Sequence, residues 1–195
     1  MSIERIKRPA SEELRKHRVL IGSVGYHNLR NFSIGPKLLP ALQSLDWPPG
    51  IEVEEMNWGP IAIVQRFEAM IDPFERVVFL TARPDNRPVG QITLWRWRGG
   101  LPDDENLQAR IGDAVTGVIS IDNLLIIGEY FKIWPPEVFV VDVEPGEEEA
   151  GEVLTPEVER RVPEILATIR QLALEPMERL PDFIAMRGDS LAVEA

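Results

Sequence analysis

The sequence predicts a three-layer α/β/α domain built on a mostly parallel sheet of about five strands. Three observations favour this fold class. Short apolar runs alternate with segments of helical apolar spacing, as in strands that are joined by crossover helices. The chain has 195 residues, a length that suits one domain. Hydrophobic residues make up 44% and charged residues 27% of it, the proportions of an ordinary globular protein.

The predicted strands cover residues 18–24, 51–57, 76–82, 89–97 and 138–143. The first is a short apolar run that ends at Gly25, as in a buried parallel strand. The third is apolar on both faces, so it should lie at the centre of the sheet. The fourth follows a turn of only a few residues over 83–87, which is too short for a parallel crossover. We therefore expect the fourth strand to have an antiparallel neighbour.

The predicted helices cover residues 33–45, 61–70, 120–131 and 155–172. Ser33 could cap the first helix, and Pro40 should kink it. The last helix begins with Thr155, Pro156 and Glu157, which combine a capping residue, a proline in the first turn and an acid at the positive end of the helix dipole. Residues 99–116 have a polar composition and are predicted to form a long connection.

The chain divides into a charged N-terminal arm (1–17), the α/β domain (18–174) and a C-terminal tail (175–195) without a clear period. The arm lacks the apolar core of a signal peptide, and no apolar run is long enough for a membrane span. A cytoplasmic protein is therefore expected. The chain has no cysteine, which excludes disulfides, thiolate metal sites and a cysteine nucleophile.

The net charge of −11 argues against general nucleic-acid binding, because phosphate contacts require clustered Lys and Arg. The acidity is concentrated between Asp142 and Glu159, where eight carboxylates occur without a basic residue.

Ligands of such sheets bind beyond the carboxyl ends of the strands. The polar residues predicted near this edge are His27, Asn28, Asn57, Arg83, Asp85 and Asp122. Of the two histidines, only His27 could serve as a base there, although a solvent-facing or satisfied histidine is the simpler role. The spacing of Asp85 and Asp122 does not require a metal, and the nucleophile-elbow, dinucleotide and Walker motifs are absent. We expect neither a metal nor a cofactor.

The order of elements resembles the hydrogenase maturation endopeptidases. The resemblance is carried by the glycine-ended first strand, the loop that closes at Ile34-Gly35, and the late helix start over residues 154–158. It covers most of residues 18–174. It implies a five-stranded sheet flanked by helices. It also implies recognition of nickel in an immature hydrogenase large subunit through a Glu, an Asp and a His, before a C-terminal peptide is cleaved.

The resemblance places these three ligands at Phe32, Thr81 and Gly117, and it places Asn31 where the family usually has an acid. No histidine occurs between residues 28 and 195. A phenylalanine offers no lone pair, a glycine has no side chain, and a neutral hydroxyl replaces a carboxylate poorly. Nickel recognition by this route should therefore be lost. Phe32 should either fill the former crevice or wait there for an apolar partner group.

Two functional hypotheses remain. The first is a non-catalytic relative that binds a protein partner, in the assembly or maturation of a complex or as its subunit. That partner could be a hydrogenase large subunit or a related metalloenzyme component. The alternative is an enzyme, a peptidase or other hydrolase, with a rebuilt site that uses His27, Asn31, Thr81, Arg83, Asp85 or Asp122. A structural or oligomer-forming role is a third.

Trp95 and Trp97 lie two residues apart in the fourth strand, so alternation puts both on one face of the sheet. Two interpretations are open for them. They either pack beneath a helix or, together with neighbouring arginines, form an interaction surface of the kind that contains interface hot spots.

Overall fold

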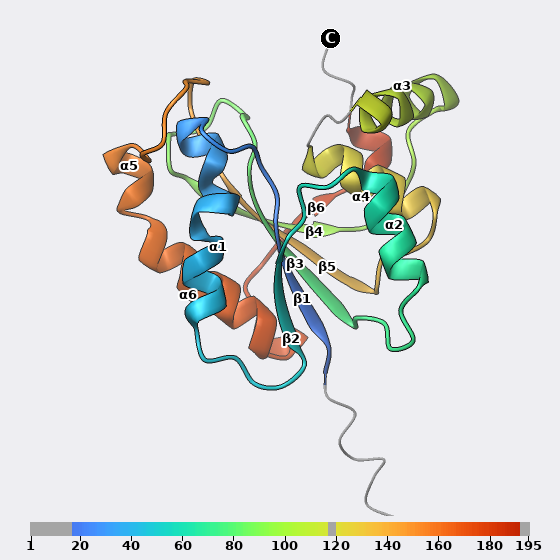
Figure 1. The fold of residues 1–195 in the computed structure, drawn as a ribbon, viewed down its shortest axis with the longest axis horizontal. Coiled ribbons are helices and arrows are strands. Elements are labelled where there is room, and N and C mark those ends of the chain that lie inside the picture. The colour runs from blue at the N-terminus through green and yellow to red at the C-terminus, as the bar shows by residue number, and fades with distance from the viewer. Residues whose placement is uncertain (1–16, 117–119, 192–195) are drawn as a thin grey trace, which may run out of the picture.

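A computed structural model describes residues 17–116 and 120–191, which form one sheet with helices on both faces (Figure 1). The strands are β1 (Val19–Ser23), β2 (Ile51–Glu55), β3 (Arg76–Ala82), β4 (Ile92–Trp97), β5 (Glu137–Val143) and β6 (Ile184–Met186). The helices are α1 (Ile34–Ser44), α2 (Pro60–Glu68), α3 (Asp104–Thr116), α4 (Ile121–Tyr130), α5 (Pro156–Glu159) and α6 (Val162–Leu174). Short 3-10 turns are η2 (Arg30–Ser33), η3 (Met177–Arg179) and η4 (Gly188–Ser190). The predicted α/β class and its mostly parallel sheet are confirmed.

The six strands lie in the order β2-β1-β3-β5-β4-β6. Strands β2, β1, β3 and β5 are mutually parallel, and β3 is central, as its apolar faces predicted. Strand β4 runs antiparallel, and its antiparallel neighbour is β5 rather than β3. The predicted number of five strands was one too low. The sixth strand, β6, pairs with β4 from within the segment that was assigned to a tail, and three residues are too few to show a period.

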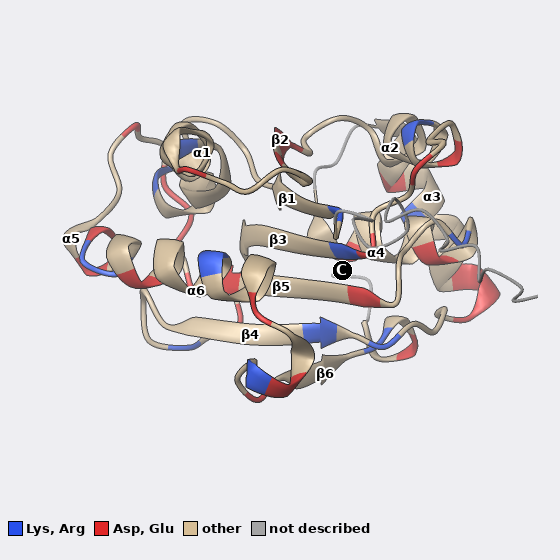
Figure 2. Ribbon diagram, turned by 90° about the horizontal axis from the view of Figure 1, so that it is seen from below, with Lys and Arg blue, Asp and Glu red and all other residues tan. Residues whose placement is uncertain are grey.

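Alternation along the central strands divides the core into two halves. In β3, Val77 and Phe79 belong to the cluster that α2 and α4 cover, whereas Val78 and Leu80 belong to the cluster beneath α1 and α6. Figure 1 shows α1, α5 and α6 on one side of the sheet and α2, α3 and α4 on the other. Charged residues in β3 and β5 occur only at or near the strand ends (Figure 2). Parallel strands that are buried on both faces require this composition.

Two helical predictions were wrong in detail, those for residues 104–116 and 155–172. Residues 104–116, predicted as a connection, form α3, which begins with Asp104 and Glu105 in its first turn. Helix α1 contains Pro40, which is exposed, within its length, and the predicted kink there stays a prediction. The predicted helix over 155–172 is divided into α5 and α6, because Pro163 has no N–H to continue the ladder of α5 and instead occupies the first turn of α6.

No single helix in residues 17–116 and 120–191 has the length and apolar composition of a membrane span. Helices α3 and α4 meet these criteria only when they are taken together, across a bend of 114°.

Helix α1 begins in direct contact with the backbone of the two strands beneath it. A Cβ atom on Gly35 would lie 2.7 Å from the carbonyl oxygen of Val24 and 3.0 Å from that of Leu80. The Leu80 carbonyl also accepts a hydrogen bond of 2.9 Å from the N–H of Val24. Only glycine therefore allows this approach, which sets the position of η2 and of the loop before α1.

We expect Gly35→Ala to lower the free energy of unfolding by about 1–3 kcal/mol, because backbone atoms cannot yield as a flexible side chain does. Gly112→Ala is the matched control, since Gly112 lies in α3 with no atom within 4 Å of an added Cβ. That change should be neutral or stabilise the protein by up to about 1 kcal/mol. Urea unfolding measures both variants. Equal stability of Gly35→Ala and the wild type would show that α1 is not held at this distance.

Candidate binding pocket at the carboxyl edge of the sheet

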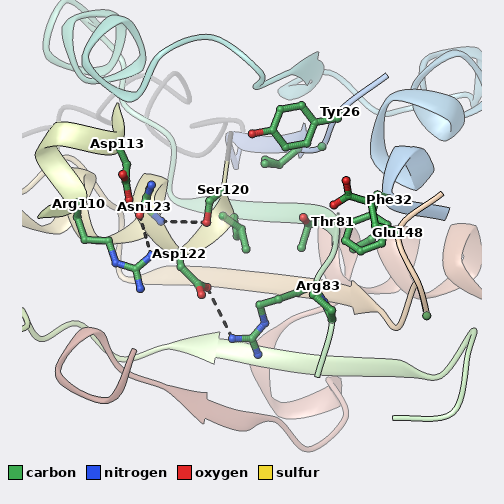
Figure 3. A pocket seen from close by; sticks show the side chains of 16 residues that line it. Tyr26, Phe32, Thr81, Arg83, Arg110, Asp113, Ser120, Asp122, Asn123 and Glu148 are labelled. Atoms are coloured by element: carbon green, nitrogen blue, oxygen red, sulfur yellow. Dashed lines mark hydrogen bonds and ion pairs between the residues drawn. The ribbon is translucent and has the colours of Figure 1, made fainter. Parts of the chain in front are cut away.

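A cavity of about 560 Å³ opens at the carboxyl ends of β1 and β3. Strand β2 lies on one side of β1 and β3 on the other, so the strand order reverses at this point, where open α/β sheets bind their ligands. The walls are the loop after β1, the turn η2, the ends of β3, α3 and α4, and the loop after β5 (Figure 3). The labelled side chains are Tyr26, Phe32, Thr81, Arg83, Arg110, Asp113, Ser120, Asp122, Asn123 and Glu148.

Four predicted site residues meet in this cavity, and they are Phe32, Thr81, Arg83 and Asp122. Gly117 lies outside the described residues. Arg110 and Asp113 were missed because their segment was predicted as a polar connection rather than as α3. Glu148 was missed because the long loop after β5 has no period that would place it.

The two described positions that the resemblance assigns to acidic metal ligands lie on the same cavity. Phe32 is half-buried in η2, and Thr81 is buried at the end of β3. Neither side chain carries a charge. Within the described ranges, no group of three or more His, Cys, Asp and Glu side chains could hold a metal ion. The cavity therefore has the location of a site but lacks this pair of carboxylates.

Asn31 precedes Phe32 but is not among the residues that line the cavity. It is buried, and its Nδ2 donates to the carbonyl of Pro145 at 2.8 Å and to the Thr155 hydroxyl at 3.2 Å. Its Oδ1 accepts from the N–H of Thr155 at 2.9 Å. These bonds fasten η2 to the two ends of the loop after β5. Asn31 thus acts as a structural tether, a role that cannot be recognised before the loop is placed.

The residues named for a rebuilt catalytic site are brought together only in part, since Thr81, Arg83 and Asp122 line the cavity. His27 is 63% exposed and its Nε2 lies 2.8 Å from Glu55 Oε1. Asp85 is held elsewhere, with its carboxylate 3.7 Å from Arg87 and its N–H donating to Glu144. Neither His27 nor Asp85 lines the cavity. The histidine that was predicted as a base is thus paired with Glu55 outside the lining of the cavity.

The other two predicted asparagines, Asn28 and Asn57, shape the loops around the cavity rather than its lining. Asn57 Oδ1 accepts a hydrogen bond of 2.8 Å from the N–H of Gly25, which joins the ends of β1 and β2. Asn28 has a φ of 62°, a left-handed conformation that asparagine tolerates. Its carbonyl accepts from the N–H of Gly151 at 2.9 Å.

A buried ionic network lies beside the cavity at the end of β5. Asp142 is fully buried and Glu144 is 2% exposed. Arg87 contacts both of them, at 2.8 Å and 3.2 Å. Asp142 also accepts from the Arg83 N–H at 3.0 Å and from Trp95 Nε1 at 3.2 Å. Burial raises the pKa of Asp142 above its ordinary value, while Arg87 and Arg83 act in the opposite direction.

Trp95 and Trp97 share one face of β4, as predicted. Trp97 is only 6% exposed, packs in the core cluster that α4 covers, and donates from Nε1 to Glu129 at 2.9 Å. Of the two interpretations left open, the burial of Trp97 favours packing beneath a helix, because α4 covers this side chain. Trp95 is half-buried, and the guanidinium carbon of Arg83 lies 4.9 Å from the centroid of its ring.

The same fold occurs in hydrogenase maturation endopeptidases. The HybD enzyme from Escherichia coli is 20% identical, with a TM-score of 0.59 over 78% of this chain and 89% of that one. An Escherichia coli endopeptidase in solution gives a TM-score of 0.60 at 19% identity, over 80% and 91% of the two chains. The HycI protease from Thermococcus kodakarensis is 20% identical, with a TM-score of 0.55 over 83% and 96%. Neither a protein-family model nor a curated protein matches the sequence.

We expect Arg87→Met to lower the free energy of unfolding by about 3–5 kcal/mol, because it leaves two buried carboxylates without their shared cation. Arg98→Met is the control, since Arg98 is exposed just beyond the end of β4, and its cost should stay within about 0.5 kcal/mol. Urea unfolding at neutral pH compares the two. If Arg87→Met lowers the free energy of unfolding no more than the control does, then water, rather than Arg87, compensates these charges.

Proposed function

We propose that this protein is a divergent, non-catalytic relative of the hydrogenase maturation endopeptidases that binds a polypeptide segment in the cavity. Its partner would be a hydrogenase large subunit or a related metalloenzyme component, and its role would lie in the assembly or maturation of that complex. The observation that carries the proposal is the joint position of Phe32 and Thr81 on one cavity. The binding location is kept, while its ligand chemistry is changed.

The residues of the cavity favour binding over peptide cleavage. A volume of about 560 Å³ falls within the range of roughly 300–1,000 Å³ that is usual for ligand sites. Tyr26 and Phe32 supply aromatic surface, and Arg83 and Asp122 supply charge. A general base needs hydrogen-bond access to the proton that it removes. The histidine that was the candidate base is instead paired with Glu55 away from the cavity.

The partner class is supported by the likeness to the endopeptidases named above, whose printed names state that they act in hydrogenase maturation. A shared fold does not by itself transfer an activity. The proposed partner class therefore comes from the likeness to these endopeptidases. The proposed lack of peptidase activity comes from the residues that line the cavity.

The protein should bind no stoichiometric nickel or zinc. Phe32 and Thr81 offer neither a carboxylate nor an imidazole, and such groups, with cysteine thiolate, are the usual ligands of these metals. Elemental analysis of the purified, tag-free protein tests this expectation. One tightly held transition-metal ion per chain would contradict it.

Phe32→Glu tests whether the aromatic wall of the cavity binds the partner. Phe32 is half-buried in an open cavity, so the new carboxylate can remain hydrated. We expect stability to change by no more than about 0.5 kcal/mol, while recovery of the partner falls about tenfold or more, as for a hot-spot residue. The assay is a pull-down of tagged protein from its native cells, with thermal unfolding measured in parallel.

Phe131→Glu is the matched control, because Phe131 is 42% exposed just beyond the far end of α4 and does not line the cavity. It should recover the partner as the wild type does. If Phe32→Glu lowers the free energy of unfolding by several kcal/mol, the Phe32 side chain fills the cavity and is buried there. If it leaves both stability and partner recovery unchanged, the cavity is not the binding site. Recovery of no hydrogenase-related protein by the wild type would reject the partner class.

A further inference from the structure

We propose that Arg83 binds a carboxylate in the cavity, and that the ligand places an apolar group against Phe32. The inference rests on the proposed function only in using the same cavity, and it names the chemistry that this cavity recognises. Two sources share that chemistry, namely the C-terminal carboxylate of a polypeptide and a small free organic acid.

Arg83 is held in a fixed position before any ligand arrives. Its N–H donates to Asp142 at 3.0 Å, and its carbonyl accepts from Arg87 at 3.0 Å. Its guanidinium carbon lies 4.9 Å from the centroid of the Trp95 ring. An arginine that stacks on an aromatic ring keeps its planar fork of donors available at the edges. Arg83 is thus pre-organised, and binding would require little ordering of its side chain.

The donors of this guanidinium are poorly used within the described residues. Its two nearest carboxylates are Asp142, 3.6 Å from Nε, and Asp122, 3.7 Å from Nη1. Both distances exceed the 2.7–3.2 Å that is usual for a hydrogen bond of this type. Asp142 already accepts from Arg87, Trp95 and the Arg83 N–H. Arg83 Nε is enclosed and has no hydrogen-bond acceptor in the described part of the chain.

The opposite wall also favours an anion. Helix α4 has ten residues and begins at the cavity, with Ser120 as its N-cap and residues 120–123 among those that line the cavity. The N-terminus of a helix carries a partial positive charge, which Asp122 in the first turn and the bond from the Asn123 N–H to Ser120 Oγ satisfy in part. Figure 3 shows Thr81 lying between Phe32 and the start of α4, with Arg83 below them. The charged and apolar parts of one ligand can therefore contact opposite walls of the cavity.

The charges around the cavity favour a monoanion over a phosphate. Asp113, Asp122 and Glu148 line it together with Arg83 and Arg110, so a dianion would be repelled more strongly than a carboxylate. Asp122 lies beside Arg83 and competes directly with such a ligand. Removal of the Asp122 charge should therefore tighten binding, whereas removal of the Arg83 charge should weaken it.

The probes are an N-acetylated tetrapeptide that ends in leucine, the same peptide as its C-terminal amide, and 4-methylpentanoate. Binding is followed on the full chain by NMR signals of the arginine Nε–H and tryptophan indole groups, assigned with the Arg83→Gln variant. We expect at least one of the two acids to bind with a millimolar dissociation constant. The amide should bind about tenfold more weakly or not at all, since a hydrogen bond to a charged group is the stronger kind.

Arg83→Gln should reduce the affinity for the acid about tenfold or more, and Asp122→Asn should increase it several-fold. Arg98→Gln, on an exposed residue away from the cavity, should leave it unchanged. Equal binding of peptide acid and amide would overturn the carboxylate inference while the proposed function stands. A lack of binding by every acid, or unchanged affinity in Arg83→Gln, would also overturn it. Binding of the peptide acid alone identifies a polypeptide C-terminus, and binding of 4-methylpentanoate alone identifies a small acid.

The comparison of the peptide acid with the peptide amide uses only the wild-type protein. The Asp122→Asn variant is expected to bind the acid more tightly. Instability of Arg83→Gln therefore cannot mask a failure. Partner recovery by the wild type, measured separately, reports on the proposed function alone.

Discussion

The bond of Arg87 to both Asp142 and Glu144 is the interaction on which the geometry of the site depends. Asp142 lies in β5 opposite Thr81 of β3, and both carboxylates are buried. Two ionised carboxylates at this depth require a cation and several hydrogen bonds, because desolvation costs several kcal/mol per ion. The loop that supplies these partners, residues 83–87, is therefore held against the end of β5, with Arg83 lining the cavity and lying over the ring of Trp95. Arg87, Asp142 and Glu144 thus orient residues of the cavity without lining it themselves.

The parts of the fold that could be predicted are those with a local signal. Strands buried on both faces have apolar runs, and α4 begins at Ser120 with an ordinary cap. Strand β6 could not be predicted, because three residues gain their stability only from pairing with β4. Helix α3 was missed because its composition is polar. The ionic network has no sequence signature, since Arg87 and Glu144 are 57 residues apart.

The candidate site was predicted in a similarly uneven way. The resemblance to the endopeptidases placed Phe32 and Thr81 in one site, and both line the cavity. The polar residues at the predicted strand ends added four candidates to this site. Arg83 and Asp122 line the cavity, whereas Asn57 and His27 make contacts around it. Proximity to a strand end selects a region, whereas side-chain direction depends on contacts from distant segments. Asn31 illustrates this limit, because its partners Pro145 and Thr155 lie more than a hundred residues away.

The attachment of the loop after β5 has a consequence for how fast a ligand can enter. Besides the bonds of Asn31, the N–H of Arg30 donates to Gly151 and that of Gly151 donates to Asn28, so the loop that carries Glu148 is fastened to the turn that carries Phe32. These two segments should open or close together, as one wall rather than as a hinged lid. Association on this side of the cavity would then be limited by encounter and orientation, with rate constants near the common range of about 10⁵–10⁷ M⁻¹ s⁻¹. Differences in affinity between ligands would arise mainly in how long each one stays bound.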